Sequence, residues 1–523
     1  MAFKKTAIGF LAVAVTAALS LAGCAKTEES KMIVVGTSDK IVALDPAGAF
    51  DHGSLTVEIQ VYSFLYGFVP GFDTPQPDAA EVCEYVEPTV FECKIREGLK
   101  FANGHDLTAS DVKFTYDRMV AISDPNGPVD LLDNLDSVDV VDELTVRFNL
   151  VAENDQTFLQ ILATSAGPIV DEEVFPADAL ISDEDIIAAN AFSGPYTITS
   201  YAKNEVAEFT PYADYIGAQP KPANDGVTMK TFTDATNLML SITNGDIDVA
   251  YRSLTPTDIE SLQANKNVKV WDAPGGEIRY IVFNFDIMPG ETVAQKLAIR
   301  QAVAASIDRN ALSEQVYKGQ YLPLCSYVPD SFAGANQAVC DLYGDAPDLE
   351  KATAYLADAG VETPVTLPLQ YSIEHYGSSS AEEYGLIKKQ LEDTGLFTVE
   401  LQSAEWGAYT KEYNRDGYQV FQLGWFPDYP DGDNYLSPFF RNGGFFNNHF
   451  SNAEVNTLLT AQNTEADPAA RAALLGDIQD ILAQYLPTLP LLQGSQWAFS
   501  RTNITGIQLG VDENLHFNTI AKS

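Results

Sequence analysis

The first 24 residues have the order of a secretory signal that ends in a cysteine. Lys4 and Lys5 give a basic start, an apolar run follows from Ile8 to Leu19, and Leu21-Ala22-Gly23-Cys24 has the form of a bacterial lipobox. The alternative is a permanent transmembrane helix, but the run is shorter than the ~20 apolar residues that span a bilayer. We therefore expect a signal peptide over residues 1–23 and a lipid on Cys24.

This segment restricts the function of everything that follows it. Residues 24–31 have the composition of a lipidated cysteine and a polar tether, and no later apolar run is long enough to cross a membrane. We expect the lipid to be the only anchor, on the extracellular or periplasmic face of the cell membrane. A protein held there has no access to ATP or NADH, which removes most enzyme classes. The 523 residues leave room for about two to four domains.

The charge balance is extreme. There are 73 acidic and 31 basic residues, which gives a formal net charge of −42. Such a surface repels nucleic acid and anionic lipid, so a nucleic-acid partner is excluded. The surface could attract cationic solutes, or it could serve only to keep a cell-surface protein soluble.

The four cysteines after Cys24 form two pairs that are close in sequence, Cys83 with Cys93 and Cys325 with Cys340. Outside the cell, such pairs indicate two disulfides, although four cysteines also allow two other connectivities. Metal binding competes with this interpretation, but the sequence has no CxxC and its five histidines are scattered. We expect neither a metal nor a cofactor.

Strand and helix patterns alternate along the chain, which predicts a mixed α/β fold. The strongest local signals are a hairpin at 81–96 that Cys83–Cys93 would close, a helix that Thr108 caps, a helix over 293–309, and a helix from Asp467-Pro468 to about Tyr485.

Motifs of the common enzyme classes are missing. The sequence has no GxSxG elbow, HExxH helix, Walker A loop or GxGxxG fingerprint. A glycosidase-like pair could still be hidden among the many carboxylates. The acidic stretch Asp428–Asn434 could be a calcium loop or a solvated turn, but it lacks the EF-hand spacing and the terminal bidentate acid.

A set of short motifs occurs in one fixed order along residues 32–520. The motifs are Leu44-Asp45-Pro46, Ile95–Phe101 with Asn103-Gly104, Leu107–Phe114, Ser193–Tyr196, Asn244–Asp248, Arg300–Ala302 with Ser306–Arg309, and Gly424–Tyr429. In this order behind a lipobox, the chain resembles the family 5 extracellular solute-binding proteins of peptide ABC importers, which include dipeptide- and oligopeptide-binding lipoproteins.

The resemblance implies an α/β, two-lobed, three-domain clamp of the periplasmic-binding-protein type (type II, cluster C) with a hinge between the lobes. Its expected parts are lobe one with domain I (32–74, 192–281 and 496–523), an inserted domain II (75–191), and lobe two or domain III (282–495). It also implies a monomeric receptor and not an enzyme. The receptor would capture short peptides between its lobes and deliver them to membrane permease subunits that cytoplasmic ATPases drive.

A peptide is an extended backbone with a positive amine, so its receptor needs strand-edge hydrogen bonds and an anion. The resemblance places Asp428 as the partner of the peptide α-ammonium, although a cap or loop carboxylate is the alternative. Gly424 would allow close approach of a backbone, and Trp425, Tyr429 and Trp406 would form pocket walls, or simply buried aromatic surface.

Two departures from the family pattern leave the ligand open. Gln422-Leu423 carries no arginine, so a cation for the peptide carboxylate is not evident, and Asp431-Gly432-Asp433 replaces the Asp-Pro of many relatives. Relatives in the same fold bind oligosaccharides or nickel chelates. The Trp-x-x-Asp motif favours peptides over sugars, because a sugar has no cationic end. A surface hydrolase and a signalling or adhesion lipoprotein remain as alternatives from other classes.

Overall fold

The computed structural model describes residues 31–252 and 254–523. The predicted signal peptide, Cys24 and all of the predicted tether except Lys31 lie outside these residues. In the described part of the chain, no helix combines the length and the apolar character that crossing a bilayer requires. Helices and strands alternate throughout, as the sequence predicts.

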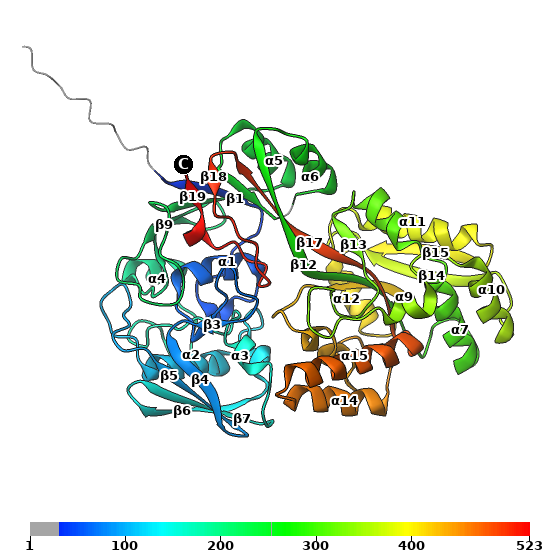
Figure 1. Ribbon diagram of the computed structural model, residues 1–523, viewed down its shortest axis with the longest axis horizontal. Coiled ribbons are helices and arrows are strands. Elements are labelled where there is room, and N and C mark those ends of the chain that lie inside the picture. The colour runs from blue at the N-terminus through cyan, green and yellow to red at the C-terminus, as the bar shows by residue number, and fades with distance from the viewer. Residues whose placement is uncertain (1–30, 253) are drawn as a thin grey trace, which may run out of the picture. The chain divides into compact units, whose positions relative to one another are not determined.

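A mixed sheet of eleven strands runs through the described residues in the order β15-β14-β16-β12-β17-β11-β1-β10-β9-β8, and β13 pairs with β17 outside this path (Figure 1). Around it the buried side chains of the described residues form four cores. Three of them define the regions used below, and the fourth, in which α5 (Ala235–Asn244) and α6 (Pro256–Gln263) pack, is assigned to the first region.

The first region is built on β1 and contains the chain's last residues. Its elements are β1 (Ile33–Thr37), α1 (His52–Val61), α4 (Asp183–Ala189), β8 (Tyr196–Ala202), β9 (Val206–Pro211), β10 (Val227–Thr231), α5 (Ala235–Asn244), β11 (Val249–Tyr251), α6 (Pro256–Gln263), β18 (Ile504–Thr505) and β19 (Ala521–Lys522).

The second region carries its own antiparallel sheet, in the order β4-β5-β7-β6. Its elements are β2 (Tyr66–Gly67), β3 (Gln76–Pro77), β4 (Ala80–Glu87), β5 (Val90–Ile95), α2 (Ala109–Ile122), β6 (Leu135–Asp142), β7 (Thr145–Leu150) and α3 (Phe158–Ile161). The predicted hairpin and helix are confirmed here. Cys83 and Cys93 lie opposite each other in the register of β4 and β5 and form a disulfide. Thr108 caps α2 in a capping box with Asp111.

The third region holds most of the helices. Its elements are α7 (Val293–Ala304), α8 (Arg309–Ala311), β13 (Tyr321–Pro323), α9 (Ala338–Tyr343), α10 (Leu349–Asp358), β14 (Val365–Ser372), α11 (Ser380–Asp393), β15 (Phe397–Ala404), α12 (Trp406–Tyr413), β16 (Val420–Trp425), α13 (Ser437–Phe440), α14 (Ala453–Thr464) and α15 (Pro468–Tyr485). The predicted Cys325–Cys340 disulfide is confirmed.

The predicted helix over 293–309 is wrong at its C-terminal end. α7 stops at Ala304, and the Asp308 side chain accepts a hydrogen bond from Ala311 N to cap a new turn. Ser306 Oγ bonds back to the carbonyl of Ala302, so local side-chain bonds compete here with the helix. The helix at Asp467-Pro468 is confirmed, with Asp467 as its N-cap.

Two long strands, β12 (Val268–Phe283) and β17 (Thr488–Arg501), join the first region to the third. Residues Val268–Pro274 of β12 pair with the C-terminal half of β17, and Ile278–Val282 pair with its N-terminal half. The register shifts between Pro274 and Ile278, at Gly275-Gly276. A Cβ on Gly276 would lie 2.6 Å from the Pro427 ring and from Tyr435 Oη, so glycine is needed where the loop after β16 crosses this strand.

Candidate ligand-binding site

A cavity of about 400 Å³ lies where β12 and β17 pass between the first and third regions. Ligand pockets commonly have ~300–1,000 Å³, so the space suits a small solute. The first region contributes Tyr251, Arg252, Leu254–Pro256, Ile259 and Glu513, the third contributes Tyr317, Gln320, Tyr321, Glu374–Ser379 and Phe426, and the two long strands contribute Gly275, Glu277, Arg279 and Gly494–Trp497.

Arg279 is a buried cation in the wall of this cavity, with 4% of the residue exposed. Its Nη2 lies 2.8 Å from Glu277 Oε1 and donates to Tyr321 Oη at 3.2 Å. Tyr317, Tyr321 and Tyr376 place their rings 5.4, 4.8 and 5.8 Å from the guanidinium carbon. Among the described residues, Nε and Nη1 of Arg279 have no hydrogen-bond acceptor. The guanidinium is therefore held rigidly with part of its donor capacity unused.

A second cation, Arg252, lies on the side of the first region. Its Nε is 3.3 Å from an Asp39 carboxylate oxygen, and its Nη1 donates to His52 Nε2 at 2.7 Å. Burial, and then the charge of Arg252, lower the pKa of His52 to about 4, so the imidazole is neutral at physiological pH. His52 Nε2 also lies 2.8 Å from Glu513 O, and the neutral ring adds no charge to the site.

Trp406 supports the cavity wall from behind. The wall residue His375 stacks on the Trp406 indole with 3.6 Å between ring centroids and 1° between the planes, and Tyr376 packs against the same indole by its edge. Trp406 N also donates to Glu374 Oε1 at 2.6 Å. The predicted wall residue therefore positions three lining residues and is not itself part of the lining.

Asp428 and Trp425 are tied together by a residue that the sequence analysis missed. Asn434 is 2% exposed, and its Oδ1 accepts from Trp425 Nε1 at 2.7 Å and from Asp428 N at 3.0 Å. Its Nδ2 donates to Asp428 Oδ2 at 3.2 Å. One buried amide thus holds both ends of the Trp-x-x-Asp motif.

Asp428 is partly buried and has no cation beside it. Within residues 31–252 and 254–523, no Lys, Arg or His forms an ion pair with its carboxylate. Burial raises the pKa of Asp428 to about 6, and the Asn434 hydrogen bond only partly opposes this shift. The loop therefore contains an anion whose ionisation an added cation would favour.

Gly424 and Tyr429 make protein contacts. A Cβ on Gly424 would lie 2.8 Å from Ile278 O and 2.9 Å from the Tyr376 ring, so close strand packing already requires glycine there. Tyr429 is 7% exposed, belongs to the core of the second region, and donates its hydroxyl to Asp433 Oδ2 at 3.2 Å.

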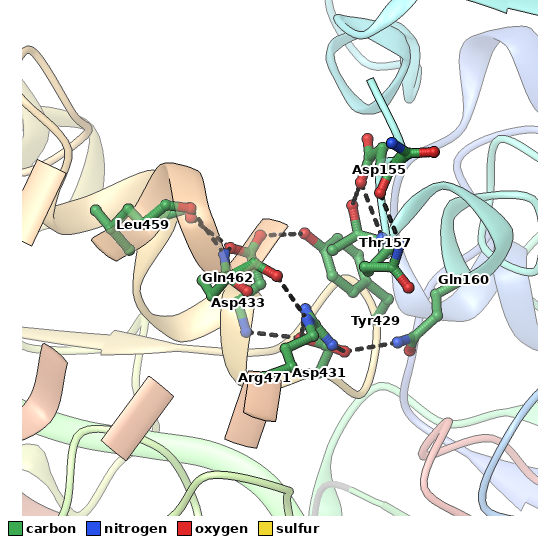
Figure 2. A network of polar contacts seen from close by, with 12 residues as sticks. Asp155, Thr157, Gln160, Tyr429, Asp431, Asp433, Leu459, Gln462 and Arg471 are labelled. Atoms are coloured by element: carbon green, nitrogen blue, oxygen red, sulfur yellow. Dashed lines mark hydrogen bonds and ion pairs between the residues drawn. The ribbon is translucent and has the colours of Figure 1, made fainter. Parts of the chain in front are cut away.

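Asp431 forms the centre of a polar network between the third and second regions (Figure 2). Arg471 donates two hydrogen bonds of 2.7 Å to its carboxylate, and Gln160 Nε2 donates to Oδ2 at 2.8 Å. Asp433 receives hydrogen bonds from Ser437 and Gln462. In the part of the chain that the structure describes, no three His, Cys, Asp or Glu side chains are grouped to hold a metal ion.

The predicted and observed sites therefore overlap only in part. None of the predicted residues Asp428, Trp425, Gly424, Tyr429 and Trp406 is a lining residue of the cavity. Trp406 and Gly424 contact lining residues, and Asp428 follows the lining residue Phe426 by two positions. Sequence reasoning missed Arg279, although an arginine inside a run of strand hydrophobics is unusual, since buried charge is costly. It also missed the roles of Asn434, although this residue ends the acidic stretch that the sequence analysis noted, and of Arg471, for which no local signal exists.

The comparisons with known proteins identify the family. Residues 74–447 match the model "Bacterial extracellular solute-binding proteins, family 5 Middle". Because this match covers well over half of the chain, the protein belongs to the family 5 extracellular solute-binding proteins. The group consists of receptors for ABC importers and is not a family of enzymes.

Individual relatives cover nearly the whole chain. The glutathione-binding protein GsiB of Escherichia coli (strain K12) is 26% identical, with 97% of both chains covered. The structure of HbpA2 from Haemophilus parasuis matches with a TM-score of 0.80 at 20% identity, covering 94% of this chain and 100% of that chain. The dipeptide-binding protein from Pseudoalteromonas sp. SM9913 in complex with Met-Leu matches at a TM-score of 0.74, 20% identity, and the same coverage of 94% and 100%. The fold is thus the two-lobed α/β clamp that the sequence predicted.

Proposed function

We propose that this protein captures short peptides between its lobes and delivers them to an ABC-type permease. The observation that carries the proposal is Asp428, a partly buried carboxylate that lacks a cation beside the cavity. The relatives support the same ligand class, since glutathione and Met-Leu are both short peptides with an ammonium and a carboxylate.

Asp428 supplies the anion that a peptide α-ammonium requires. An ammonium close to the carboxylate lowers its pKa again and forms a charge-assisted hydrogen bond, which contributes about 1.5–3 kcal/mol. Asn434 holds the carboxylate in one position before the ligand arrives, which reduces the entropy lost on binding.

Arg279 is the proposed partner of the peptide carboxylate. It lines the cavity, and three tyrosine rings and Glu277 fix its guanidinium. Its unused Nε and Nη1 donors lie on different sides of the guanidinium, so a peptide carboxylate would accept one charge-assisted hydrogen bond from either of them. The buried Glu383 lies with Oε2 3.9 Å from Arg279 Nη1, and burial raises the pKa of its carboxyl.

We further propose how the rest of the chain serves this role. Cys24 would carry the lipid that holds the receptor at the membrane, as a monomer. The first and second regions would form lobe one and the third region lobe two, with the boundaries given by the family resemblance. The irregular pairing at Gly275-Gly276 between β12 and β17 would be the hinge about which the lobes close.

Native mass spectrometry of the purified protein tests the ligand class directly. We expect a co-purifying mixture of short peptides that is lost after unfolding and refolding. A single sugar or metal complex in its place, or conversion of the bound peptide to products, would overturn the proposal.

A further inference from the structure

The loop of residues 428–435, called here the docking loop, has two sides. Asp428 is held by Asn434 within the third region, whereas Tyr429, the next residue, contributes its ring to the core of the second region. The docking loop therefore joins the proposed ammonium site directly to the contact between the two regions.

The third region builds the docking loop from its own residues. Arg471, at the start of α15, neutralises Asp431, while Ser437, Gln462 and Tyr429 donate hydrogen bonds to Asp433. Figure 2 shows Asp433, Gln462 and Arg471 on one side and Asp155, Thr157 and Gln160 of the second region on the other, with the Tyr429 ring between them. The loop thus presents a neutralised, pre-ordered surface to the second region.

Three contacts cross between the regions at this place. The Tyr429 ring is buried in the second region's core, Gln160 Nε2 donates to Asp431 Oδ2, and the backbone N–H of Gln156 donates to Asn463 O at 3.0 Å. Figure 1 shows α3 facing α14 and α15, the helices that contain Asn463 and Arg471. Asp155 holds the receiving segment in place through Thr157 N and Oγ1.

We propose that Tyr429 is a positioning residue that couples ammonium binding at Asp428 to docking of the third region on the second. This inference rests on the proposed function. Tyr429 and Asp428 are adjacent on a short loop, so a ligand bound to Asp428 stabilises the loop position in which the tyrosine is inserted, and insertion in turn stabilises the position of Asp428 that binds the ammonium. By thermodynamic linkage, the docking contacts strengthen ligand binding by the same factor by which ligand strengthens docking.

The test uses Gln160→Ala, a change in the second region on a side chain that is only partly buried. It removes the hydrogen bond to Asp431 without touching Asp428 or the cavity. Gln156→Ala is the matched control, because its side-chain amide donates to Asn154 O within the same region and only its backbone crosses. Tyr429→Ala removes the inserted ring, and Tyr429→Phe retains it.

The closed fraction of ligand-free protein is measured by energy transfer between dyes on the second and third regions. Affinity is measured by calorimetry with Met-Leu, glutathione and their N-acetyl forms. We expect Tyr429→Ala to lower both the closed fraction and the affinity, the latter by about 5- to 150-fold, the usual range of such coupling. Gln160→Ala should shift both quantities in the same direction by less, and Gln156→Ala should resemble wild type. Tyr429→Phe keeps the inserted ring but loses the hydroxyl bond to Asp433, so its effect should be smaller than that of Tyr429→Ala.

A structural defect would weaken free and N-acetylated peptides equally. The inference requires Tyr429→Ala to reduce the preference for the free amine as well, because Asp428 loses its position. Unchanged closed fractions in Gln160→Ala and Tyr429→Ala, or an unchanged preference for the free amine in Tyr429→Ala, would overturn it. If wild type binds neither peptide, the proposed function fails, whereas the closed fractions still report separately on the docking contacts.

Discussion

Asp428 and Asp431 occupy the same short loop but have opposite electrostatic surroundings. Asp431 accepts two hydrogen bonds from Arg471 and one from Gln160. Asp428 receives one amide hydrogen bond, and burial raises its pKa to about 6. The protein neutralises the carboxylate that joins two of its regions and leaves the one near the cavity without a cation. Of these two carboxylates, only Asp428 lacks an ion-pair partner among the described residues, which makes it the candidate for binding a cationic ligand.

We expect the largest loss of folding stability when Arg471, the cation paired with Asp431, is replaced. Arg471→Met leaves Asp431 and the nearby buried Asp433 without compensation, and breaking such a pair from one side costs about 3–5 kcal/mol of folding stability. Urea unfolding measures the loss. The double variant Arg471→Met/Asp431→Asn should recover part of the lost stability. If Arg471→Met alone changes stability by less than about 0.5 kcal/mol, Asp431 does not depend on Arg471, and the electrostatic difference between Asp431 and Asp428 is not supported.

Arg279 is the proposed cation for the peptide carboxylate, as Asp428 is the proposed anion for the ammonium. Wild type should prefer a peptide with a free C-terminal carboxylate over its amide by about 1.5–3 kcal/mol, or roughly tenfold to over a hundredfold in affinity. Arg279→Gln should abolish this preference and Arg279→Lys should keep part of it, since lysine retains the charge but not the planar guanidinium with its fixed N–H directions. Calorimetry on both peptides decides the point. A preference that persists in Arg279→Gln would place the carboxylate elsewhere.

The pH dependence of folding stability tests whether the buried Asp428 carboxylate lacks a compensating charge. The folded-state pKa of Asp428 is raised from 3.8 to about 6, so the folded protein binds this proton more tightly than the unfolded chain does. Asp428 therefore reduces stability as pH rises from about 4 to 7. At pH 8, ligand-free Asp428→Asn should exceed wild type by about 1–3 kcal/mol, and the difference should disappear near pH 4. Urea unfolding at both pH values measures it, and equal stability at pH 8 would contradict the burial of an uncompensated carboxylate.

Local sequence signals predicted much of the fold. Thr108 and Asp111 cap α2, and Cys83 and Cys93 meet across a hairpin, because the interacting residues are neighbours along the chain or along paired strands. The family resemblance supplied the two-lobed arrangement, which local patterns do not contain.

The site was predictable only where its residues form a continuous motif. Trp425 and Asp428 belong to one, and the Trp-x-x-Asp spacing drew attention to them. Gln160 and Asp431 are 271 positions apart, and Arg471 is 40 positions from Asp431, so only the folded chain brings them together. Arg279 lines the cavity because of the way β12 pairs with β16 and β17. Local sequence patterns do not predict the register between these strands.

The central claim, that Asp428 is the anion for a peptide α-ammonium, is tested most directly by calorimetry on four combinations. Wild type and Asp428→Asn are each titrated with Met-Leu or glutathione, whichever wild type binds, and with its N-acetyl form. Either change alone should cost about 1.5–3 kcal/mol, and both together should cost little more than one, because they remove the same interaction. If acetylation weakens binding as much in Asp428→Asn as in wild type, Asp428 does not bind the amine, and the proposed ammonium site is wrong.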